Sequence, residues 1–397
     1  MSLLSRVVML VDLDYFFAQC EEVRNPSIKD KPVVVCHHTG RSENSGVACT
    51  TNYIAREFDV KSGTTITTAR KLLRHKNAIF LEADYGLYRR VSKNVRRILE
   101  KYADHFEPFG VDEAYLDVTK KVQGSFEQAK TLGQKIKDEI KEKENLSCSI
   151  GIGPNKLIAK IASEQEKPDG LTVVKPCEVE SFLFPLPVKR LFGVGRRTEK
   201  KLIHLGITKI GDLAKYDLQK LKFIFGNKPG TYLHNAAWGI DNSPVEQVEI
   251  IKSIGNSYTL KTNTRDLEVI LEKASKLCEK VHKRLLKKDF LYRTVGISVS
   301  TTRMEFITRA KTVKNASNNL EVFKKTVKEL LEKTMDEFES KVRRVGVRLS
   351  NLVKEEKKQK QLIQFLEVLP RQRSCEQAKV DDEGRRHVFR RYKEAFK

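Results

Sequence analysis

Two stretches decide the fold of this chain: VDLDYFF at residues 11–17 and FGVDEAYLD at residues 109–117. The first ends a short apolar, β-branched run, residues 6–12, that is typical of a buried strand. The second has the pattern of a hairpin turn followed by its returning strand, residues 114–118. Each stretch therefore places acidic side chains at the end of a strand, and the surrounding elements predict whether those ends meet.

The other elements of this half predict a single sheet. Two long amphipathic helices and a last strand are expected at residues 85–102, 126–143 and 146–152. The resulting order β, α, β, β, α, β is the split βαβ arrangement, with both helices on one face of the sheet. Residues 18–77 interrupt this order as a small inserted lobe, with a strand at 32–36 and a helix at 52–58. The predicted fold class is α+β.

Three carboxylates are expected to converge in this sheet. The first strand should pair beside the hairpin, which brings Asp12 next to Asp112 and Glu113. Like charges repel unless cations neutralise them, and hard oxygen ligands suit Mg²⁺. Two such ions can activate an attacking hydroxyl and stabilise a pyrophosphate leaving group, which predicts a phosphoryl or nucleotidyl transferase. Asp14 is expected instead to cap the following helix, which should end near Asn25.

Basic side chains flank the same edge and could hold a triphosphate. Tyr53 and Arg56 lie three apart, on one face of a helix in the inserted lobe. Lys160 and Lys167 flank the helix after the last strand. Each of them alone could equally form a surface salt bridge, so only their joint position favours a substrate site.

Residues 186–240 are predicted to be mainly helical and contain the turn Phe192-Gly193-Val194-Gly195. Such a turn exposes backbone N–H groups at a helix start and can seat one phosphate. Glycine turns between helices more often serve packing alone, so this motif does not decide between the two roles.

After a linker at about 241–246, a second α/β module is predicted. Its strands and helices are expected at residues 252–260, 266–288, 292–301, 304–310, 317–339 and 342–349. The alternation points apolar residues to the helices, namely Val295, Ile297, Val299, Val345, Val347 and Leu349. The opposite face is small, polar and basic, with Thr294, Gly296, Ser298, Ser300, Arg344, Gly346 and Arg348. This face suits a phosphate backbone, although a solvated antiparallel face would show the same pattern.

Charge supports a polyanionic partner. The chain of 397 residues has 75 basic and 52 acidic residues, a net charge of +23. Residues 251–397 hold 36 of these basic and 20 of the acidic residues, and so carry +16 of that charge. The seven cysteines form no C-x-x-C pair, and no apolar stretch reaches the length of a membrane span, so a cytoplasmic protein without a membrane partner is expected.

The chain resembles a known family at this point. Eight motifs occur in the order seen in Y-family translesion DNA polymerases of the DinB (polymerase IV) type, archaeal ones in particular: VDLDYFFAQ (11–19), KPVVV (31–35), TTNYIAREF (50–58), VDEAYLD (111–117), SIGIGPNKLIAKIAS (149–163), KPDG (167–170), the Gly193-Val194-Gly195 turn and RRVGVRLS (343–350). The resemblance covers about residues 5–350, and its first and fourth motifs are highly specific together.

The resemblance implies a right-hand polymerase that performs error-prone, template-directed translesion synthesis. It would transfer a nucleotide from a dNTP to a primer 3′-hydroxyl with two Mg²⁺ ions, without proofreading and with exclusion of ribonucleotides. Its implied domains are a ferredoxin-like palm (1–17 and 78–172), small fingers (18–77), a helical thumb with a helix-hairpin-helix (173–240), a linker (241–246), an α/β little finger (247–350) and a charged tail (351–397). Primer-template DNA and dNTP are the implied partners of a monomer.

The resemblance also implies residue roles. The metal ligands and catalytic carboxylates are Asp12, Asp112 and Glu113, helped by the Leu13 carbonyl, while Asp14 is excluded. The dNTP contacts are Phe16, Phe17, Thr50, Tyr53, Arg56 and Lys167. Phe17 is the steric gate, where relatives often have Tyr. DNA contacts are Gly193, Gly195, Arg344 and Arg348. Gly46, Val47 and Gly63 fall in the part of the fingers that covers the nascent base pair, where small residues imply a loose roof. Apolar residues are expected on this roof, and His37 and His38 depart from that expectation.

The tail contains Gln359, Leu362, Phe365 and Leu366 with the spacing of a sliding-clamp-binding peptide. The alternative is a short amphipathic helix that folds against its own domain. Three rival functions also stay open: a nucleotide cyclase, which uses two metals on a similar sheet, an inactive DNA-binding scaffold, and a transferase restricted to inserting dCMP.

Overall fold

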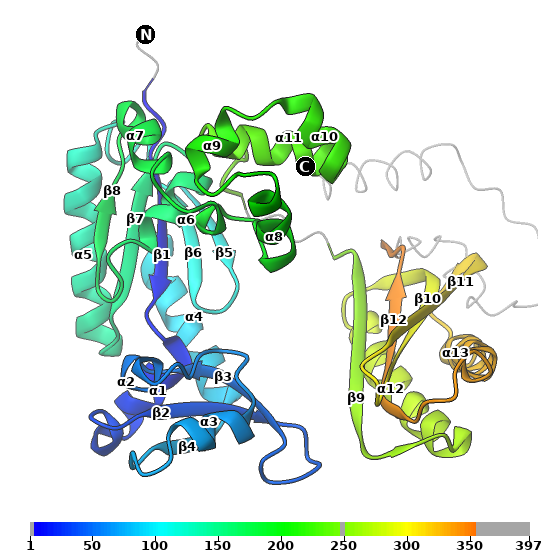
Figure 1. Ribbon diagram of the computed structural model, residues 1–397. Coiled ribbons are helices and arrows are strands. Elements are labelled where there is room, and N and C mark those ends of the chain that lie inside the picture. The colour runs from blue at the N-terminus through cyan, green and yellow to red at the C-terminus, as the bar shows by residue number, and fades with distance from the viewer. Residues whose placement is uncertain (1–3, 247–250, 355–397) are drawn as a thin grey trace, which may run out of the picture.

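The computed structural model describes residues 4–246 and 251–354, arranged as four units (Figure 1). The first unit is the central sheet, with strand order β5-β6-β1-β7-β8. Its strands are β1 (Val8–Leu13), β5 (His105–Phe109), β6 (Glu113–Asp117), β7 (Cys148–Gly153) and β8 (Leu171–Val173). All neighbours are antiparallel except β7 and β8, which run parallel. The predicted split βαβ sheet is confirmed, with β8 as an additional edge strand.

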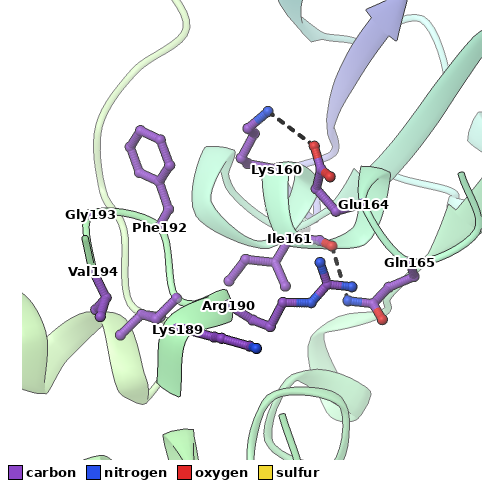
Figure 2. A pocket seen from close by; sticks show the side chains of 10 residues that line it. Lys160, Ile161, Glu164, Gln165, Lys189, Arg190, Phe192, Gly193 and Val194 are labelled. Carbon is purple, nitrogen blue, oxygen red and sulfur yellow. Dashed lines mark hydrogen bonds and ion pairs between the residues drawn. The ribbon is translucent and has the colours of Figure 1, made fainter. Parts of the chain in front are cut away.

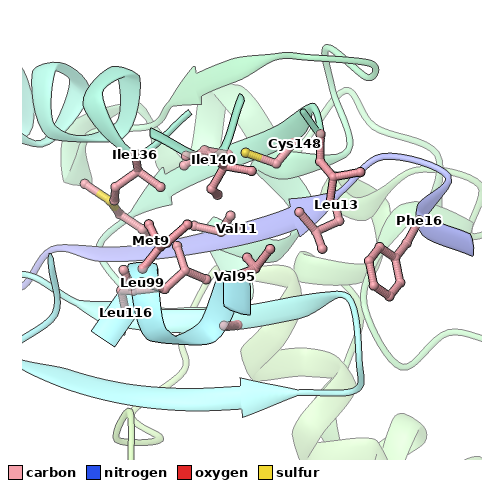
Figure 3. Packing of buried hydrophobic residues seen from close by; sticks show 14 of the residues in the cluster. Met9, Val11, Leu13, Phe16, Val95, Leu99, Leu116, Ile136, Ile140 and Cys148 are labelled. Atoms are coloured by element: carbon pink, nitrogen blue, oxygen red, sulfur yellow. The ribbon is translucent and has the colours of Figure 1, made fainter. Parts of the chain in front are cut away.

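Both faces of the central sheet are covered, which buries β1 completely. Helices α4 (Tyr85–Tyr102) and α5 (Phe126–Glu144) lie on one face. Figure 3 shows Met9 and Val11 of β1 packed between side chains of these helices, such as Leu99 and Ile140. Helix α6 (Lys156–Ser163) covers the other face, where Ala159 packs with residues of β1 and β6. A continuous apolar run is what a strand buried on two faces requires.

The second unit, the small lobe, lies beyond the carboxyl end of β1 (Figure 1). Its sheet has the order β3-β2-β4, with strands β2 (Val33–His38), β3 (Gly46–Thr51) and β4 (Ile79–Glu82). Its helical segments are α1 (Phe16–Arg24), η1 (Pro26–Ile28), α2 (Tyr53–Glu57) and α3 (Ile66–Leu72). Helix α1 ends at Asn25 as predicted, but its N-cap is Tyr15, not Asp14, and no side chain caps it.

The third unit is helical and packs on α6. Its segments are η2 (Pro176–Glu178), α7 (Val179–Leu183), η3 (Val188–Arg190), α8 (Arg196–His204), α9 (Ile210–Ala214), α10 (Leu218–Phe225) and α11 (Asn227–Ala237). Leu183, Leu202 and Leu213 of this helical unit share one buried cluster with Ile158 and Ile161 of α6. The helical unit is thereby fixed to the face of the central sheet that α6 covers.

The fourth unit, the carboxyl-terminal sheet unit, has the strand order β11-β10-β12-β9, with all these neighbours antiparallel. Its elements are β9 (Ser253–Thr264), α12 (Leu267–Leu286), β10 (Phe290–Thr301), β11 (Phe306–Ser317), α13 (Leu320–Met335), β12 (Val342–Ser350) and β13 (Val353–Lys354). The predicted inward residues of β10 and β12 are all buried. Strand β11 runs seven positions beyond the predicted end at Ala310.

Two residues that were predicted to face outward in this sheet are nevertheless buried. Ser300 is 6% exposed, and it lies opposite Arg344 in the register. Gly346 is also buried, and a Cβ there would come within 2.5 Å of the Ser298 hydroxyl oxygen. Longer side chains on neighbouring positions shield these two small residues from solvent. This shielding explains why Ser300 and Gly346 are buried although they face outward.

The small lobe also contacts the carboxyl-terminal sheet unit. Arg41, in the loop between β2 and β3, donates through Nε to the carbonyl oxygen of Lys261 at 3.1 Å. Its Nη2 donates to Oδ1 of Asn263 at 2.7 Å. Two units that are separated by about half the chain are therefore joined directly. No helix in the described ranges is long and apolar enough to cross a bilayer.

Gly151 of β7 allows the close approach of α6, and we predict that Gly151→Ala destabilises the protein. An added Cβ would lie 2.1 Å from the carbonyl oxygen of Ala159 and 2.3 Å from the amide nitrogen of Ser163. Since both atoms belong to backbone, we expect a loss of about 2 kcal/mol in the free energy of unfolding, measured by urea denaturation. Gly195→Ala is the control, because its Cβ would meet nothing within 4 Å. Equal stability of the two variants would contradict the prediction.

Candidate active site

The register of β1 against β6 brings the predicted carboxylates together. Asp12 lies directly opposite Glu113 in the antiparallel pair. The next amide, that of Leu13, donates to the carbonyl oxygen of Asp112 at 2.9 Å. Asp12 is 4% exposed, whereas Asp112 and Glu113 are half-buried, so the carboxylates at this edge of the sheet are withdrawn from water to different degrees.

Burial makes ionisation of these carboxylates unfavourable. It raises the pKa of Asp12 and of Asp112 above the usual value, although Lys160 and Lys167 act in the opposite direction. Burial first, and then the charge of Asp12, raise the pKa of Glu113 to about 7. The site therefore requires positive charge to keep its carboxylates ionised.

Two lysines supply positive charge within the site. Lys160 of α6 places Nζ 2.8 Å from Oε2 of Glu113 and 3.4 Å from Oδ2 of Asp12. Lys167 places Nζ 2.7 Å from the same oxygen of Asp12 and 3.1 Å from Glu164. Burial lowers the pKa of Lys167, but the charges of Asp12 and Glu164 outweigh it, so this pKa stands above its usual value. Both ammonium groups thus neutralise carboxylates at this edge.

The donor set nevertheless fits a divalent cation. In residues 4–246 and 251–354 no three Asp, Glu, His or Cys side chains are already arranged around a common metal position. The lysine contacts account for this, because ammonium groups pair with the oxygens of Asp12 and Glu113 that a cation would take. Carboxylate oxygens of Asp12, Asp112 and Glu113 are nevertheless the hard ligands that Mg²⁺ prefers.

Asp14 has a different role from the one expected. Its carboxylate is fully buried and accepts hydrogen bonds from the hydroxyls of Ser149 at 2.7 Å and Ser147 at 3.0 Å. The amide of Asp169 is a third donor, at 2.9 Å. The expected helix cap is therefore wrong, because three donors far along the chain take both oxygens. The carboxylate holds the start of α1 against β7 and the segment after α6.

A cavity of about 180 Å³ joins the carboxylates to the small lobe. Its lining includes nine of the residues proposed for metal and nucleotide: Asp12, Leu13, Phe16, Thr50, Tyr53, Arg56, Asp112, Glu113 and Lys167. The guanidinium of Arg56 lies 4.6 Å from the centre of the Tyr53 ring, so the two residues share one helix face as expected. The lining of this solvent-open cavity thus combines the cationic and hydroxyl groups of Arg56, Tyr53 and Thr50 with the carboxylates of the central sheet.

Phe17 follows the lining residue Phe16 in the chain but does not itself line this cavity, and its ring is stacked on that of Tyr88. The ring centres are 4.2 Å apart and the planes meet at 11°. Phe16, by contrast, is 2% exposed and belongs to the core of the central sheet. Of the two phenylalanines, Phe17 therefore has the more accessible ring.

The residues expected to form the roof lie in the small lobe. Val47 is 40% exposed. A Cβ on Gly46 would lie 2.2 Å from the carbonyl oxygen of His37, so close strand pairing requires glycine there. Gly63 has a positive φ of 87° and open space beside it. His37 and His38 end β2, and the ring of His37 contacts Tyr85.

The glycine turn of the helical unit faces α6. Figure 2 shows Gly193 and Val194 in the lining of a cavity of about 290 Å³, with Lys160 and Glu164 on its other side. Gly193 has a φ of 89°, and a Cβ there would come within 2.9 Å of the Tyr232 ring. Gly195 is the N-cap of α8 and is open to solvent on its Cα side. Packing explains Gly193, whereas Gly195 leaves the helix start accessible.

The remaining predicted residues lie elsewhere. Arg344 and Arg348 are exposed on the outward face of the carboxyl-terminal sheet unit, and Arg344 Nη2 donates to the Ser257 hydroxyl at 2.6 Å. Gln359, Leu362, Phe365 and Leu366 lie outside the described residues.

Sequence reasoning missed Glu164, which forms ion pairs with Lys160 at 3.6 Å and Lys167 at 3.1 Å. Its position four residues after one lysine and three before the other was the available signal.

Three family models match the chain. The impB/mucB/samB family matches residues 11–164, its C-terminal domain matches 251–362, and the DNA polymerase-iota thumb domain matches 189–241. The DNA polymerase IV of Nitrosopumilus maritimus is 43% identical over 88% of this chain and 96% of its own. That of Methanosarcina acetivorans is 43% identical over 89% and 97%.

Solved structures agree with these matches. A chimera of the Y-family DNA polymerases Dbh and Dpo4 is 36% identical, with a TM-score of 0.82 over 88% of this chain and all of that chain. An insertion ternary complex of Dbh DNA polymerase is also 36% identical over the same shares, with a TM-score of 0.63.

The fold and these matches define a DNA-directed DNA polymerase. Within that class, the chain belongs to the Y family, as an error-prone polymerase of the polymerase IV (DinB) type, for which translesion synthesis is typical. A polymerase of this family works with a divalent metal cofactor. The cyclase and the inactive scaffold are thereby excluded as interpretations.

We predict that Asp14→Ala destabilises the protein by about 3 kcal/mol in urea denaturation, because the donors of three hydrogen bonds to this fully buried carboxylate lose their acceptor. Asp30→Ala, at an exposed position of the small lobe, serves as the control and should change stability by less than about 0.5 kcal/mol. If Asp14→Ala were as stable as the control, the three hydrogen bonds would carry no net stabilisation.

Proposed function

We propose that this polymerase transfers the nucleotidyl group of a dNTP to a primer 3′-hydroxyl at the edge formed by Asp12, Asp112 and Glu113. The observation that carries the proposal is the register of β1 and β6, which sets Asp12 opposite Glu113. We assign two Mg²⁺ ions to these carboxylates and the Leu13 carbonyl. Such ions lower the pKa of an attacking hydroxyl and neutralise a pyrophosphate leaving group.

The protein's own groups would bind and orient the triphosphate. Tyr53 and Arg56 approach it from the small lobe, and Lys167 approaches from the segment after α6. Lys167 already pairs with Asp12 and Glu164, so it can exchange one anionic partner for another without moving far. Thr50 and Phe16 complete the lining. Phe17 is the steric gate, whose ring would clash with the 2′-hydroxyl of a ribonucleotide.

The four units would then take the roles of a right hand. We assign the palm to residues 1–17 and 78–172, the fingers to 18–77, the thumb to 173–240 and the little finger to 247–350, with 241–246 as linker. Strand β4 (Ile79–Glu82), just after the boundary at residue 77, pairs with β2 in the sheet of the small lobe. Two features support duplex binding. The start of α8 at Gly195 is accessible, and Arg344 and Arg348 are exposed on one sheet face.

The proposed partners are primer-template DNA and dNTP, bound by one copy of the chain in the cytoplasm. Solved relatives include an insertion ternary complex and a post-insertion binary complex of Dbh DNA polymerase, which supports this assignment for the present chain. We assign no proofreading activity, since the sequence offers no second acidic cluster of the exonuclease kind.

Asp112→Ala combined with Glu113→Ala is expected to reduce primer extension at least about a thousandfold, because the proposed metal ligands are lost. Affinity for primer-template DNA, measured by fluorescence anisotropy, should stay within a few fold, since the duplex contacts lie elsewhere. Asp30→Ala with Glu43→Ala is the matched control, because both residues are exposed in the small lobe. Continued extension by the Asp112/Glu113 variant would place the active site elsewhere.

We also propose that Gln359, Leu362, Phe365 and Leu366 bind a sliding clamp. The glutamine would anchor the peptide, and the apolar side chains would fill a pocket on the clamp. Leu362→Ala with Phe365→Ala should abolish retention on an immobilised archaeal clamp in a pull-down. Gln361→Ala with Gln364→Ala, between the anchor positions, should leave retention unchanged. Unchanged retention of the Leu362/Phe365 variant would exclude the tether.

A further inference from the structure

Tyr85, at the start of α4, borders the ring of Phe17. Its ring meets that of Phe17 edge to face, with centres 6.1 Å apart and planes at 87°. It also meets the buried ring of Tyr88 edge to face, at 6.2 Å and 83°. Tyr85 itself is 42% exposed. Its ring therefore lies beside the stacked pair of Phe17 and Tyr88, almost equally far from both.

Two residues of the small lobe hold the Tyr85 hydroxyl. The oxygen lies 3.2 Å from Nδ1 of His37, on β2, and 3.6 Å from the sulfur of Cys49, on β3. Burial first, and then the hydrogen bond with Cys49, raise the pKa of Tyr85 to about 12, so the hydroxyl keeps its proton. These contacts restrain a ring that is only half-buried, and they join α4 to the small lobe.

One face of the Phe17 ring has a firmer support. Its ring is stacked on Tyr88, which is 1% exposed. The Tyr88 hydroxyl donates to the buried Glu21 carboxylate at 2.7 Å. Tyr88 is thus held in place by Glu21, and Tyr85 is the half-exposed ring that meets Phe17 beside the stacked pair.

We propose that Tyr85, held by His37 and Cys49, is a positioning residue that keeps the Phe17 ring in the path of a ribonucleotide 2′-hydroxyl. The proposal rests on the assignment of Phe17 as the sugar gate. A steric gate excludes a ribose only while its ring cannot turn aside, so the neighbour that blocks this movement contributes to selectivity. His37 thereby gains a function that an apolar residue at its position could not have, since it supplies a polar partner for the hydroxyl.

The test is single-nucleotide insertion on a primer-template by the full-length chain, with dCTP and CTP compared opposite template dG. Selectivity is the ratio of kcat/KM for dCTP to that for CTP. An edge-to-face aromatic contact corresponds to a factor of about two to ten, so Tyr85→Leu should lower selectivity by that factor. The value of kcat/KM for dCTP should change by less than about threefold, because the reacting groups are untouched. Tyr85→Phe and His37→Val keep the ring, and should give smaller losses of selectivity.

Phe17→Ala and the double variant Phe17→Ala/Tyr85→Leu separate this proposal from the gate assignment. Phe17→Ala should lower selectivity further than Tyr85→Leu does, and adding Tyr85→Leu to it should have no further effect, because a neighbour that acts through Phe17 has nothing left to position. If Phe17→Ala lowers selectivity and Tyr85→Leu does not, the role of Tyr85 is refuted while the gate stands. If Phe17→Ala leaves selectivity unchanged, the gate itself is refuted, and this role of Tyr85 with it. An undiminished effect of Tyr85→Leu in the double variant would show that Tyr85 acts independently of Phe17, which also overturns the proposal.

Discussion

The antiparallel register between β1 and β6 is the constraint on which the site depends. It sets Asp12 opposite Glu113 and ties Leu13 to the backbone of Asp112. Two like charges 4 Å apart repel by about 4 kcal/mol at an effective dielectric constant of 20, so this arrangement needs a rigid support. Strand β1 provides this support, because it is buried on both faces. A register shift of one residue would move each of its apolar side chains to the opposite face of the sheet.

The strongly periodic parts of the chain were predictable. The observed bounds of α4 are the predicted ones at both ends, because 18 residues of amphipathic sequence define a helical period clearly. The alternation of β10 and β12 was recovered because one face of that sheet is covered by helices. Strands β3 and β4 of the small lobe and the last part of β11 were missed. Strand β4 has only four residues, β3 mixes polar and apolar positions, and β11 is an edge strand with mostly exposed side chains, so none of the three shows an extended hydrophobic alternation.

The site was predictable where chemistry is concentrated in neighbouring residues and unpredictable where it depends on distant ones. Carboxylates at strand ends could be paired through the expected topology. The acceptor role of Asp14 could not, because its donors Ser147, Ser149 and Asp169 lie more than 130 residues away. Such contacts depend on how α6 and the following segment fold back, which no local pattern records.

The hydrogen bonds from Arg41 to Lys261 and Asn263 give the small lobe and the carboxyl-terminal sheet unit a direct contact in addition to their connection through the chain. The chain runs from the small lobe through the central sheet and the helical unit to the carboxyl-terminal sheet unit. The Arg41 hydrogen bonds join the first and the last of these units directly. The carboxyl-terminal sheet unit is therefore attached at two places, through the chain and through Arg41. Any displacement of the carboxyl-terminal sheet unit away from the small lobe must break the Arg41 hydrogen bonds, so one side chain links the position of that unit to the lobe that borders the catalytic edge.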